Sequence, residues 1–369
     1  MKNGRKPVAA GSGNAADACL EGRIIKGVGG FYEVWIPGDG RHVTCKARGV
    51  FRRSGQTPLA GDRVLVRLDS RDPAQGVLAE LRPRQSEFVR PPVANMDCMA
   101  IVVSAVTPAP DLPLVDKLLI ACELRGIRPL LVVNKMDLLP TGIPETDVEA
   151  PLKEGHAAAD TPLKEAQTAG DTPLKEGHTA GDSDAGSASV WQLLRTMYAA
   201  TGYEMFPVSC VTGEGIPALL DALAGCTTVL AGQSGVGKST LLNAMLDAEH
   251  METGSLSEKI GRGRHTTRHA ELLPLPGDGW MCDTPGFSRY ELDPVSYDTL
   301  DAYFPEFEPE RRQCRFPGCS HLHEPDCAVA RKLADGGISP ERHARYAQFY
   351  EELRERHQNR FRRQGGAST

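Results

Sequence analysis

The chain has 369 residues, of which 40% are hydrophobic and 6% aromatic, and its formal net charge is −6 at pH 7. This length fits roughly two or three domains of ordinary size. No apolar run approaches the length of about 18 residues that a membrane span needs, and the N-terminus lacks the apolar core of a signal peptide, so we expect a cytoplasmic protein with no membrane partner.

The N-terminal part of the chain reads as a tail followed by a small β-barrel. Residues 1–20 are rich in Ala, Gly and Asn without periodicity, which predicts a disordered tail. Five short strand-like segments follow, separated by turns that contain Gly, Pro or Asp: 22–28, 31–37, 42–49, 62–69 and 76–82. This spacing predicts an all-β barrel, for which we favour the OB-fold.

The predicted barrel is mildly basic. Between Arg23 and Arg90 there are thirteen Lys or Arg residues and seven Asp or Glu residues. Such a surface suits a phosphate backbone, and aromatic side chains in the same region are candidates to stack on bases. The alternative is a solvated charged surface over a core that uses these aromatics. They are Phe31, Tyr32, Trp35 and Phe51.

An α/β region begins near residue 90. Residues 99–104 and 130–133 are continuous apolar runs, which are typical of parallel strands buried on both faces. Between them Leu114, Leu118 and Leu119 follow a helical spacing that stops before Gly126. A strand, a helix and a strand with short connections predict a right-handed crossover unit.

The net negative charge comes from an insertion in this region. Residues 141–188 hold ten acidic residues and three lysines. The tetrapeptide PLKE recurs there at Pro151, Pro162 and Pro173, a period of eleven residues. Polar repeats with one leucine each cannot bury a core, so we predict a flexible surface insertion and assign no chemistry to it. An amphipathic helix is expected to follow at 190–198.

A phosphate-binding loop is the strongest motif. The sequence GQSGVGKST at 232–240 fits G-x-x-x-x-G-K-S/T, and it lies between a strand pattern at 227–231 and a helical apolar face. The glycines let backbone N–H groups surround phosphate oxygens, Lys238 reaches the β and γ phosphates, and Ser239 can hold Mg²⁺. The residues expected to bind the nucleotide here are Gly232, Gln233, Ser234, Gly235, Val236, Gly237, Lys238, Ser239 and Thr240.

Two further segments predict recognition of guanine. In NKMD, directly after the 130–133 strand, Asp137 can accept from both guanine N1–H and the exocyclic amine, whereas adenine offers no such pair. Asn134 can bond the base edge and bridge to the phosphate loop, and the stem of Lys135 can lie over the ring. Ser209 and Cys210 stand where a backbone amide would meet guanine O6, although a plain strand-to-helix turn is the alternative there.

Switch elements are expected downstream of the phosphate loop. The segment GRGRHTTR at 261–268 offers a threonine hydroxyl for Mg²⁺, and we favour Thr267 over Thr266. An arginine-rich loop that only contacts RNA is the compatible alternative. In WMCDTPGF, Asp283 stands where a carboxylate binds Mg²⁺ through water, and the amide of Gly286 stands where it can meet the γ-phosphate.

The order of these motifs is reversed relative to ordinary GTPases, in which the guanine motif follows the phosphate loop. Here NKMD and SCV come first. We therefore predict one circularly permuted GTPase domain.

A C-terminal cluster predicts a metal site. Cys314, Cys319, His321 and Cys327 lie within fourteen residues, and three thiolates with one imidazole make a closed tetrahedral Zn²⁺ site of structural type. His323 is the alternative imidazole, and unliganded thiols around a turn are the alternative to a metal. Farther on, a helix is expected after Ser339-Pro340, with a core face built from Tyr346, Phe349, Tyr350 and Leu353.

Together these motifs resemble the ribosome small subunit-dependent GTPase A family of bacteria over nearly the whole chain. The resemblance implies an OB-fold RNA-binding domain at 21–88, a permuted GTPase domain at 89–290, and a zinc-binding helical domain at 291–369. It also implies binding to the 30S subunit and its 16S rRNA during late maturation, with subunit-stimulated hydrolysis of GTP to GDP. A monomer is expected.

The catalytic group is the open question in this reading. Phe287 occupies the place where Ras-like enzymes carry a glutamine that orients water, and its ring cannot polarise water. We take His265 as the candidate, with a surface or RNA-contacting histidine as the alternative. Two other functions compete with this reading: an assembly scaffold that only binds GTP, and a metal-delivery GTPase that transfers metal through its cysteines.

Overall fold

The computed structural model describes residues 19–47, 49, 51, 56–88, 92–139, 189–253, 270–287, 290–292 and 294–365. The repeat insertion, the switch segment at 261–268 and nearly all of the predicted tail therefore lie outside the described residues. By its internal contacts the chain divides into two compact units, residues 1–149 with 206–294 and residues 150–205 with 295–369. Among the described helices, none has both the length and the apolar character needed to cross a bilayer.

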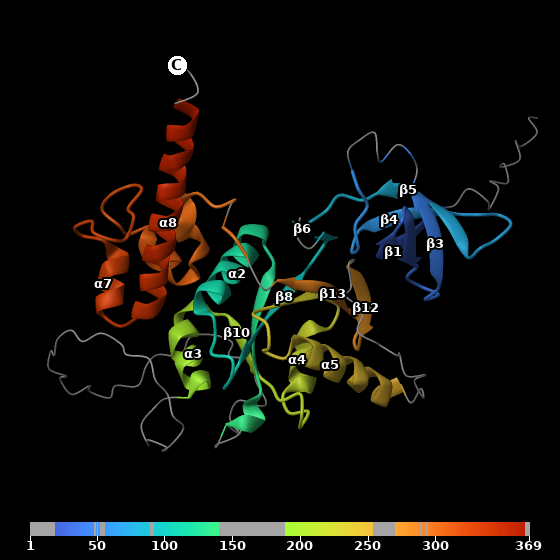
Figure 1. The fold of residues 1–369 in the computed structure, drawn as a ribbon, viewed down its shortest axis with the longest axis horizontal. Coiled ribbons are helices and arrows are strands. Elements are labelled where there is room, and N and C mark those ends of the chain that lie inside the picture. The colour runs from blue at the N-terminus through green and yellow to red at the C-terminus, as the bar shows by residue number, and fades with distance from the viewer. Residues whose placement is uncertain are drawn as a thin grey trace, which may run out of the picture. The chain divides into compact units, whose positions relative to one another are not determined.

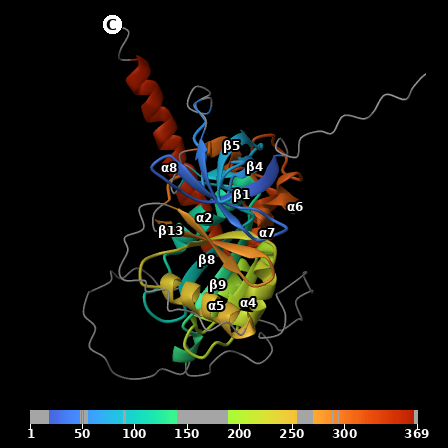
Figure 2. The same cartoon turned by 90° about the vertical axis from the view of Figure 1, so that its right-hand side faces the viewer.

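The first five strands form a closed barrel. They are β1 (Leu20–Val28), β2 (Phe31–Trp35), β3 (His42–Ala47), β4 (Arg63–Leu68) and β5 (Gln75–Leu81). They pair in the order β1-β2-β3-β5-β4, and a β1–β4 pairing closes the ring (Figure 2). Alternate residues such as Val34, Val43 and Val64 are buried, as the two-residue period requires. The predicted OB-like barrel is confirmed.

A buried ion pair fastens the end of the barrel. The Asp62 carboxylate is fully buried and accepts from Arg84 Nε and Nη2, both at 2.8 Å, and from the Leu59 amide at 2.7 Å. The hydrogen bonds to Asp62 raise the pKa of Arg84. A short hairpin of β6 (Glu87–Phe88) and β7 (Val93–Ala94) then leads from the barrel into the next region.

The α/β region is a sheet in the order β10-β9-β8-β11-β13-β12. Its strands are β8 (Cys98–Ser104), β9 (Arg128–Asn134), β10 (Glu204–Pro207), β11 (Thr227–Ala231), β12 (Glu271–Leu275) and β13 (Gly279–Phe287). Strands β9, β8, β11 and β13 are parallel, and β12 is antiparallel to β13. Strands β8 and β11 are buried along their whole length and β9 is buried after Arg128, because helices cover both faces.

Side chains of β8 alternate between two helix layers. Ala100 and Val102 belong to a core with α4 (Ile216–Leu223) and α5 (Lys238–Thr253), whereas Met99 contacts Cys122 of α2 (Leu112–Arg125). Helices α4 and α5 thus lie on one face and α2 on the other (Figure 1). Helix α2 begins where the Asp111 carboxylate accepts from the Leu114 amide. As predicted, it stops before Gly126, which has a left-handed backbone.

The barrel continues into this sheet through an unpredicted strand pairing. Strand β1 pairs with the edge strand β12 at Lys26 and Glu271, and the Lys26 ammonium lies 2.6 Å from the Glu271 carboxylate. Beside it, Arg23 Nη1 donates to Thr227 Oγ1 at 2.8 Å. One eleven-stranded sheet therefore runs from β10 to β4.

The second unit is helical. It contains α3 (Val190–Tyr198), η4 (Ala199–Thr201), η5 (Tyr297–Tyr303), η6 (Pro305–Phe307), α6 (Glu308–Arg311), α7 (Ala328–Ala334) and α8 (Pro340–Gly365). As predicted, Tyr346, Phe349 and Leu353 of α8 are buried, while Tyr350 is half-buried. Within the core Arg342 makes a bidentate pair with the Glu306 carboxylate, at 2.7 and 3.1 Å.

Candidate nucleotide site and metal centre

The carboxyl edge of the parallel strands gathers the predicted nucleotide residues. Asn134 is the last residue of β9, Gly232 follows β11 directly, and Asp283 lies in β13. The register pairs Ser104 with Asn134 on one side and Val229 with Cys282 on the other. Because parallel strands end at the same edge, motifs that are far apart in sequence meet there.

Two glycines of the phosphate loop have no room for a side chain. Gly232 has a φ of +127°, and a Cβ on it would lie 2.2 Å from the carbonyl oxygen of Val102. Gly237 has a φ of +97°, and a Cβ there would lie 2.4 Å from Asn134 Nδ2. Both positions combine a left-handed backbone with a close approach, so only glycine fits.

The side chain of Lys238, the last residue of the phosphate loop before Ser239, reaches back to the start of that loop. Its ammonium donates to the carbonyl oxygens of Gly232 at 2.8 Å and Gln233 at 2.7 Å. Burial lowers the pKa of Lys238. The next residues, Ser239 and Thr240, are exposed in the first turn of α5, where backbone N–H groups lack helical partners. The helix N-terminus and the ammonium together make this loop a site for anions.

The NKMD segment braces the phosphate loop. Asn134 Nδ2 donates to the Val236 carbonyl at 3.0 Å. Lys135 has a left-handed backbone with a φ of +66°, and its ammonium donates to the carbonyl oxygens of Thr107 at 2.6 Å and Gly235 at 2.9 Å. Residues about a hundred positions apart in sequence are thus hydrogen-bonded to one another, and the predicted bridge from Asn134 to the loop is present.

A second turn supports Asp137. The buried Ser209 hydroxyl donates to Asp137 Oδ1 at 2.7 Å and accepts from the amides of Val211 and Thr212 at 3.2 and 3.1 Å. Cys210 Sγ lies 3.2 Å from Asn134 Oδ1, and burial raises the pKa of this thiol to about 11. In this arrangement the Ser209 side chain orients the Asp137 carboxylate.

Sequence reasoning missed one brace of the phosphate loop. The Gln233 side chain accepts from the Asp111 amide at 2.6 Å and donates to the Ala109 carbonyl at 2.9 Å, so it joins the loop to the segment before α2. No motif or periodicity signals this contact, because Gln233 occupies a variable position of the G-x-x-x-x-G-K-S/T pattern.

The predicted switch residues are described only in part. Asp283 is half-buried and pairs across the sheet with Glu271 of β12. Gly286 lies near the end of β13, next to Phe287, which pairs with Ala231 at the start of the phosphate loop. The segment with Gly286 is therefore adjacent to that loop. His265, Thr266 and Thr267 lie outside the described residues.

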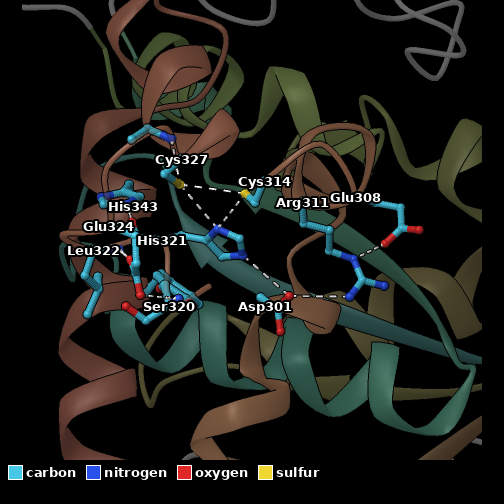
Figure 3. A network of polar contacts seen from close by, with 12 residues as sticks. Asp301, Glu308, Arg311, Cys314, Ser320, His321, Leu322, Glu324, Cys327 and His343 are labelled. Atoms are coloured by element: carbon cyan, nitrogen blue, oxygen red, sulfur yellow. Dashed lines mark hydrogen bonds and ion pairs between the residues drawn. The ribbon is translucent and has the colours of Figure 1, made fainter. Parts of the chain in front are cut away.

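The four predicted metal ligands come together in the helical unit, and Figure 3 labels Cys314, His321 and Cys327 among them. The ligand atoms of Cys314, Cys319, His321 and Cys327 all lie within 4.8 Å of one another. His321 Nδ1 is 3.5 Å from Cys314 Sγ and 3.4 Å from Cys327 Sγ, and the two sulfurs are 3.9 Å apart. His323, the alternative imidazole, is exposed and does not belong to this group.

The cluster fits zinc in its chemistry and in its size. A tetrahedral site with Zn–S bonds of about 2.3 Å has edges of roughly 3.8 Å, which matches the separation of the two sulfurs. Backbone amides face the thiols, since Ala330 N donates to Cys327 Sγ at 3.4 Å. His321 Nε2 lies 3.5 Å from the Asp301 carboxylate, the outer partner that a metal-bound imidazole usually has. The sequence did not predict Asp301.

The remaining cysteines take no part in this site. All ten cysteines of the chain are free thiols, and of the seven outside the cluster, four are buried: Cys45, Cys98, Cys122 and Cys282. Burial raises the pKa of Cys45 to about 12, which leaves it protonated and unreactive. These buried residues act as small apolar core residues.

Two family models match the chain. The model described as RsgA GTPase matches residues 81–165 and 182–293, and the model described as RsgA N-terminal domain matches residues 21–76. Together they account for the barrel and for the permuted α/β region.

Individual proteins are similar over most of their length. A small ribosomal subunit biogenesis GTPase RsgA from Ruminiclostridium cellulolyticum is 42% identical over 334 residues, which are 90% of this chain and 94% of the relative. Another, from Geobacillus thermodenitrificans, is 39% identical over 91% of this chain and 98% of its own.

Two solved structures share the fold. YjeQ from Thermotoga maritima aligns with a TM-score of 0.68 and 28% identity, covering 91% of this chain and 99% of its own. YloQ, described as a circularly permuted GTPase, aligns with a TM-score of 0.67 and 29% identity over 94% of this chain and 99% of its own. The reversed order of the motifs is therefore explained by a circular permutation of the GTPase domain.

Proposed function

The chain belongs to the RsgA GTPase family and is a GTP hydrolase, and from this premise we propose that it binds the small ribosomal subunit during late maturation. Hydrolysis is stimulated by the subunit, and conversion of GTP to GDP releases the protein from rRNA. The relatives that support this proposal are named small ribosomal subunit biogenesis GTPases. The observation that carries the nucleotide part is the bond from Asn134 Nδ2 to the Val236 carbonyl, which unites the guanine motif with the phosphate loop.

The proposed roles follow from chemistry at the carboxyl edge of the sheet. Asp137 binds the guanine N1–H and exocyclic amine, while Ser209 holds its carboxylate in place. Lys238 leaves the carbonyls of its own loop and binds the β and γ phosphates. Asp283 and the Gly286 amide stand near the γ-phosphate. Discrimination against adenine arises because it would leave the Asp137 carboxylate unpaired.

Magnesium and the hydrolytic step involve further residues. Mg²⁺, when bound with GTP, neutralises charge on the β and γ phosphates. Ser239 and Thr267 would hold it directly, and Asp283 would do so through water. His265 would orient the attacking water, because Phe287 lacks any group that can.

The remaining parts of the chain serve binding to the particle. We propose that residues 21–88, 89–290 and 291–369 act as three functional domains, with the barrel on 16S rRNA and the C-terminal domain held together by one structural zinc. The exposed Phe31 and the Lys46 ammonium, 5.3 Å from its ring centroid, give the barrel a surface for a base and a phosphate. The protein acts as a cytoplasmic monomer.

GTP hydrolysis with and without purified small subunits tests this function. We expect the subunits to raise the turnover number of the wild-type protein, and we expect Lys238→Ala to abolish turnover in both conditions. Turnover that subunits do not change would refute the ribosomal part of the proposal. Nucleotide binding without phosphate release would instead favour the scaffold, and zinc that exchanges freely with added chelator would favour metal delivery.

A further inference from the structure

Arg125 contacts two parts of the first unit, the hairpin that follows the barrel and the segment that follows β13, which the proposed mechanism does not connect. Arg125 ends helix α2, and its Nη1 donates to the Tyr290 hydroxyl at 2.9 Å and to the Ala121 carbonyl at 3.2 Å. The guanidinium carbon also lies 4.7 Å from the ring centroid of Phe88 and 5.8 Å from that of Tyr290. These distances allow cation–π attraction to both rings.

The two aromatic partners come from functionally different segments. Phe88 is 1% exposed and belongs to β6, the hairpin strand through which the barrel leads into the GTPase sheet. Tyr290 follows Gly286 by four residues and Asp283 by seven. Gly286 lies in β13, and Tyr290, three residues after the end of that strand, is bonded to Arg125.

The barrel also touches the strand next to the other switch. Strand β12 begins three residues after the predicted switch segment ends, and its first residue, Glu271, pairs with Lys26 of the barrel at 2.6 Å. The indole rings of Trp35 in β2 and Trp280 in β13 also meet, with their centroids 5.1 Å apart. The barrel is thus attached to the flanks of both predicted switch elements.

We propose that Arg125 is a positioning residue through which the barrel influences GTP hydrolysis. Binding of the subunit to the barrel shifts the β6 hairpin with Phe88, and the shared guanidinium passes this shift to Tyr290 and so to the segment carrying Gly286. That segment is the element whose position GTP and GDP bias differently. The inference rests on the proposed function, because it explains how subunit binding reaches the reacting phosphate.

The test compares subunit-stimulated with basal turnover. Arg125→Met keeps the apolar length of the side chain but removes the charge-assisted bond, and we expect it to lower the ratio of stimulated to basal turnover by about tenfold. Tyr290→Phe keeps the ring and removes only the hydroxyl, so a loss of about threefold is expected. The KM for GTP should change by less than about twofold, since Arg125 does not touch the nucleotide loop.

Control variants separate this role from general loss of structure. Arg128→Met removes an exposed arginine of the same unit outside the barrel, which begins β9 and donates to the Ala222 carbonyl of α4, and it should leave the ratio unchanged. Arg125→Lys restores a cation near both rings without the planar fork, so it should recover part of the ratio. If Arg125→Met unfolds at a lower temperature than the wild type, the stimulation ratio of Tyr290→Phe alone tests the inference.

Tryptophan fluorescence supplies a second readout. In a Trp191→Phe background only Trp35 and Trp280 emit, and we expect their emission to differ between the GDP-bound form and a form with a non-hydrolysable GTP analogue. Arg125→Met should shrink that difference. Wild-type turnover without stimulation would overturn the proposed function together with this inference. If the subunit stimulates turnover of the wild type and of Arg125→Met equally, the inference is overturned and the proposed function stands.

Discussion

Gly237 has no Cβ, and this lets the phosphate loop and the Asn134 side chain approach each other closely. We expect Gly237→Ala to weaken GDP binding by at least about tenfold, because the new Cβ must displace the Asn134 amide that bonds the Val236 carbonyl. Titration with a fluorescent GDP derivative measures the loss.

Gly225→Ala is the matched control for this substitution. Gly225 also has a left-handed backbone, with a φ of +68°, but a Cβ there would meet nothing within 4 Å. Gly225→Ala should lower the free energy of unfolding by only about 1 kcal/mol, through backbone strain, and should leave the affinity for GDP unchanged. Equal losses of affinity in the two variants would show that strain, and not the contact with Asn134, explains the effect.

Asp137 provides a second test at the level of one side chain. Asp137→Asn replaces one carboxylate oxygen by an amide donor, so guanine N1–H and the exocyclic amine no longer find two acceptors. We expect the preference for GTP over ATP to fall by about two orders of magnitude, as judged by competition for the fluorescent nucleotide. Retention of the full preference would mean that another group reads the base.

At this scale the sequence predicted residues with a motif and missed those without one. Asn134, Lys135 and Lys238 were identified because fixed spacing ties them to phosphate and guanine chemistry. Asp301 was not predicted, although it lies next to the predicted ligand His321. Gln233 was expected to bind the nucleotide, but its bond with the Asp111 amide was not predicted. Their contacts arise from the way distant segments pack, and neither hydrophobic period nor local spacing records that.

Among the elements, the cluster of Cys314, Cys319, His321 and Cys327 lies in a region with little regular structure of its own, which a bound zinc ion would stabilise. Cys314, Cys319 and His321 lie outside the helices and strands, and Cys327 accepts from the Ala330 amide at the start of the short helix α7. We expect the purified chain to contain one zinc ion, as measured by mass spectrometry. Cys314→Ser should lose most of it and lower the free energy of unfolding by several kcal/mol, because a structural zinc contributes folding energy directly.

Cys226→Ser is the appropriate comparison for that variant. Cys226 is half-buried, as Cys314 is, but it belongs to the first unit and not to the cluster. It should retain the zinc and nearly the full stability. Zinc content that is unaffected by Cys314→Ser would place the metal elsewhere or leave the cluster as free thiols.

Strands and helices were predictable wherever the hydrophobic residues of one segment followed a regular spacing. All five barrel strands and helix α2 were expected close to their observed bounds, because alternation and capping residues are local signals. The pairing of β1 with β12 was not expected. It joins residues that are 245 positions apart, Lys26 and Glu271, and a charged pair on a strand edge is indistinguishable in sequence from a solvated surface.

On the scale of the whole molecule, the two compact units divide the ligands between them. All described residues proposed to bind the nucleotide belong to the first unit, and all four metal ligands belong to the second. A ligand that binds only the folded state stabilises the unit that holds it. The chain should therefore show two calorimetric transitions, each sensitive to its own ligand.

We expect GDP at about 100 times its Kd to raise the first unit's stability by roughly 2.7 kcal/mol and to leave the second transition in place. A strong zinc chelator should lower the second transition without changing the affinity for GDP. Differential scanning calorimetry of the wild-type chain measures both effects, and Asp137→Asn and Cys314→Ser should each remove only one of them. A single transition that GDP and the chelator shift together would mean that the units unfold cooperatively. Nucleotide and metal would then stabilise one common structure.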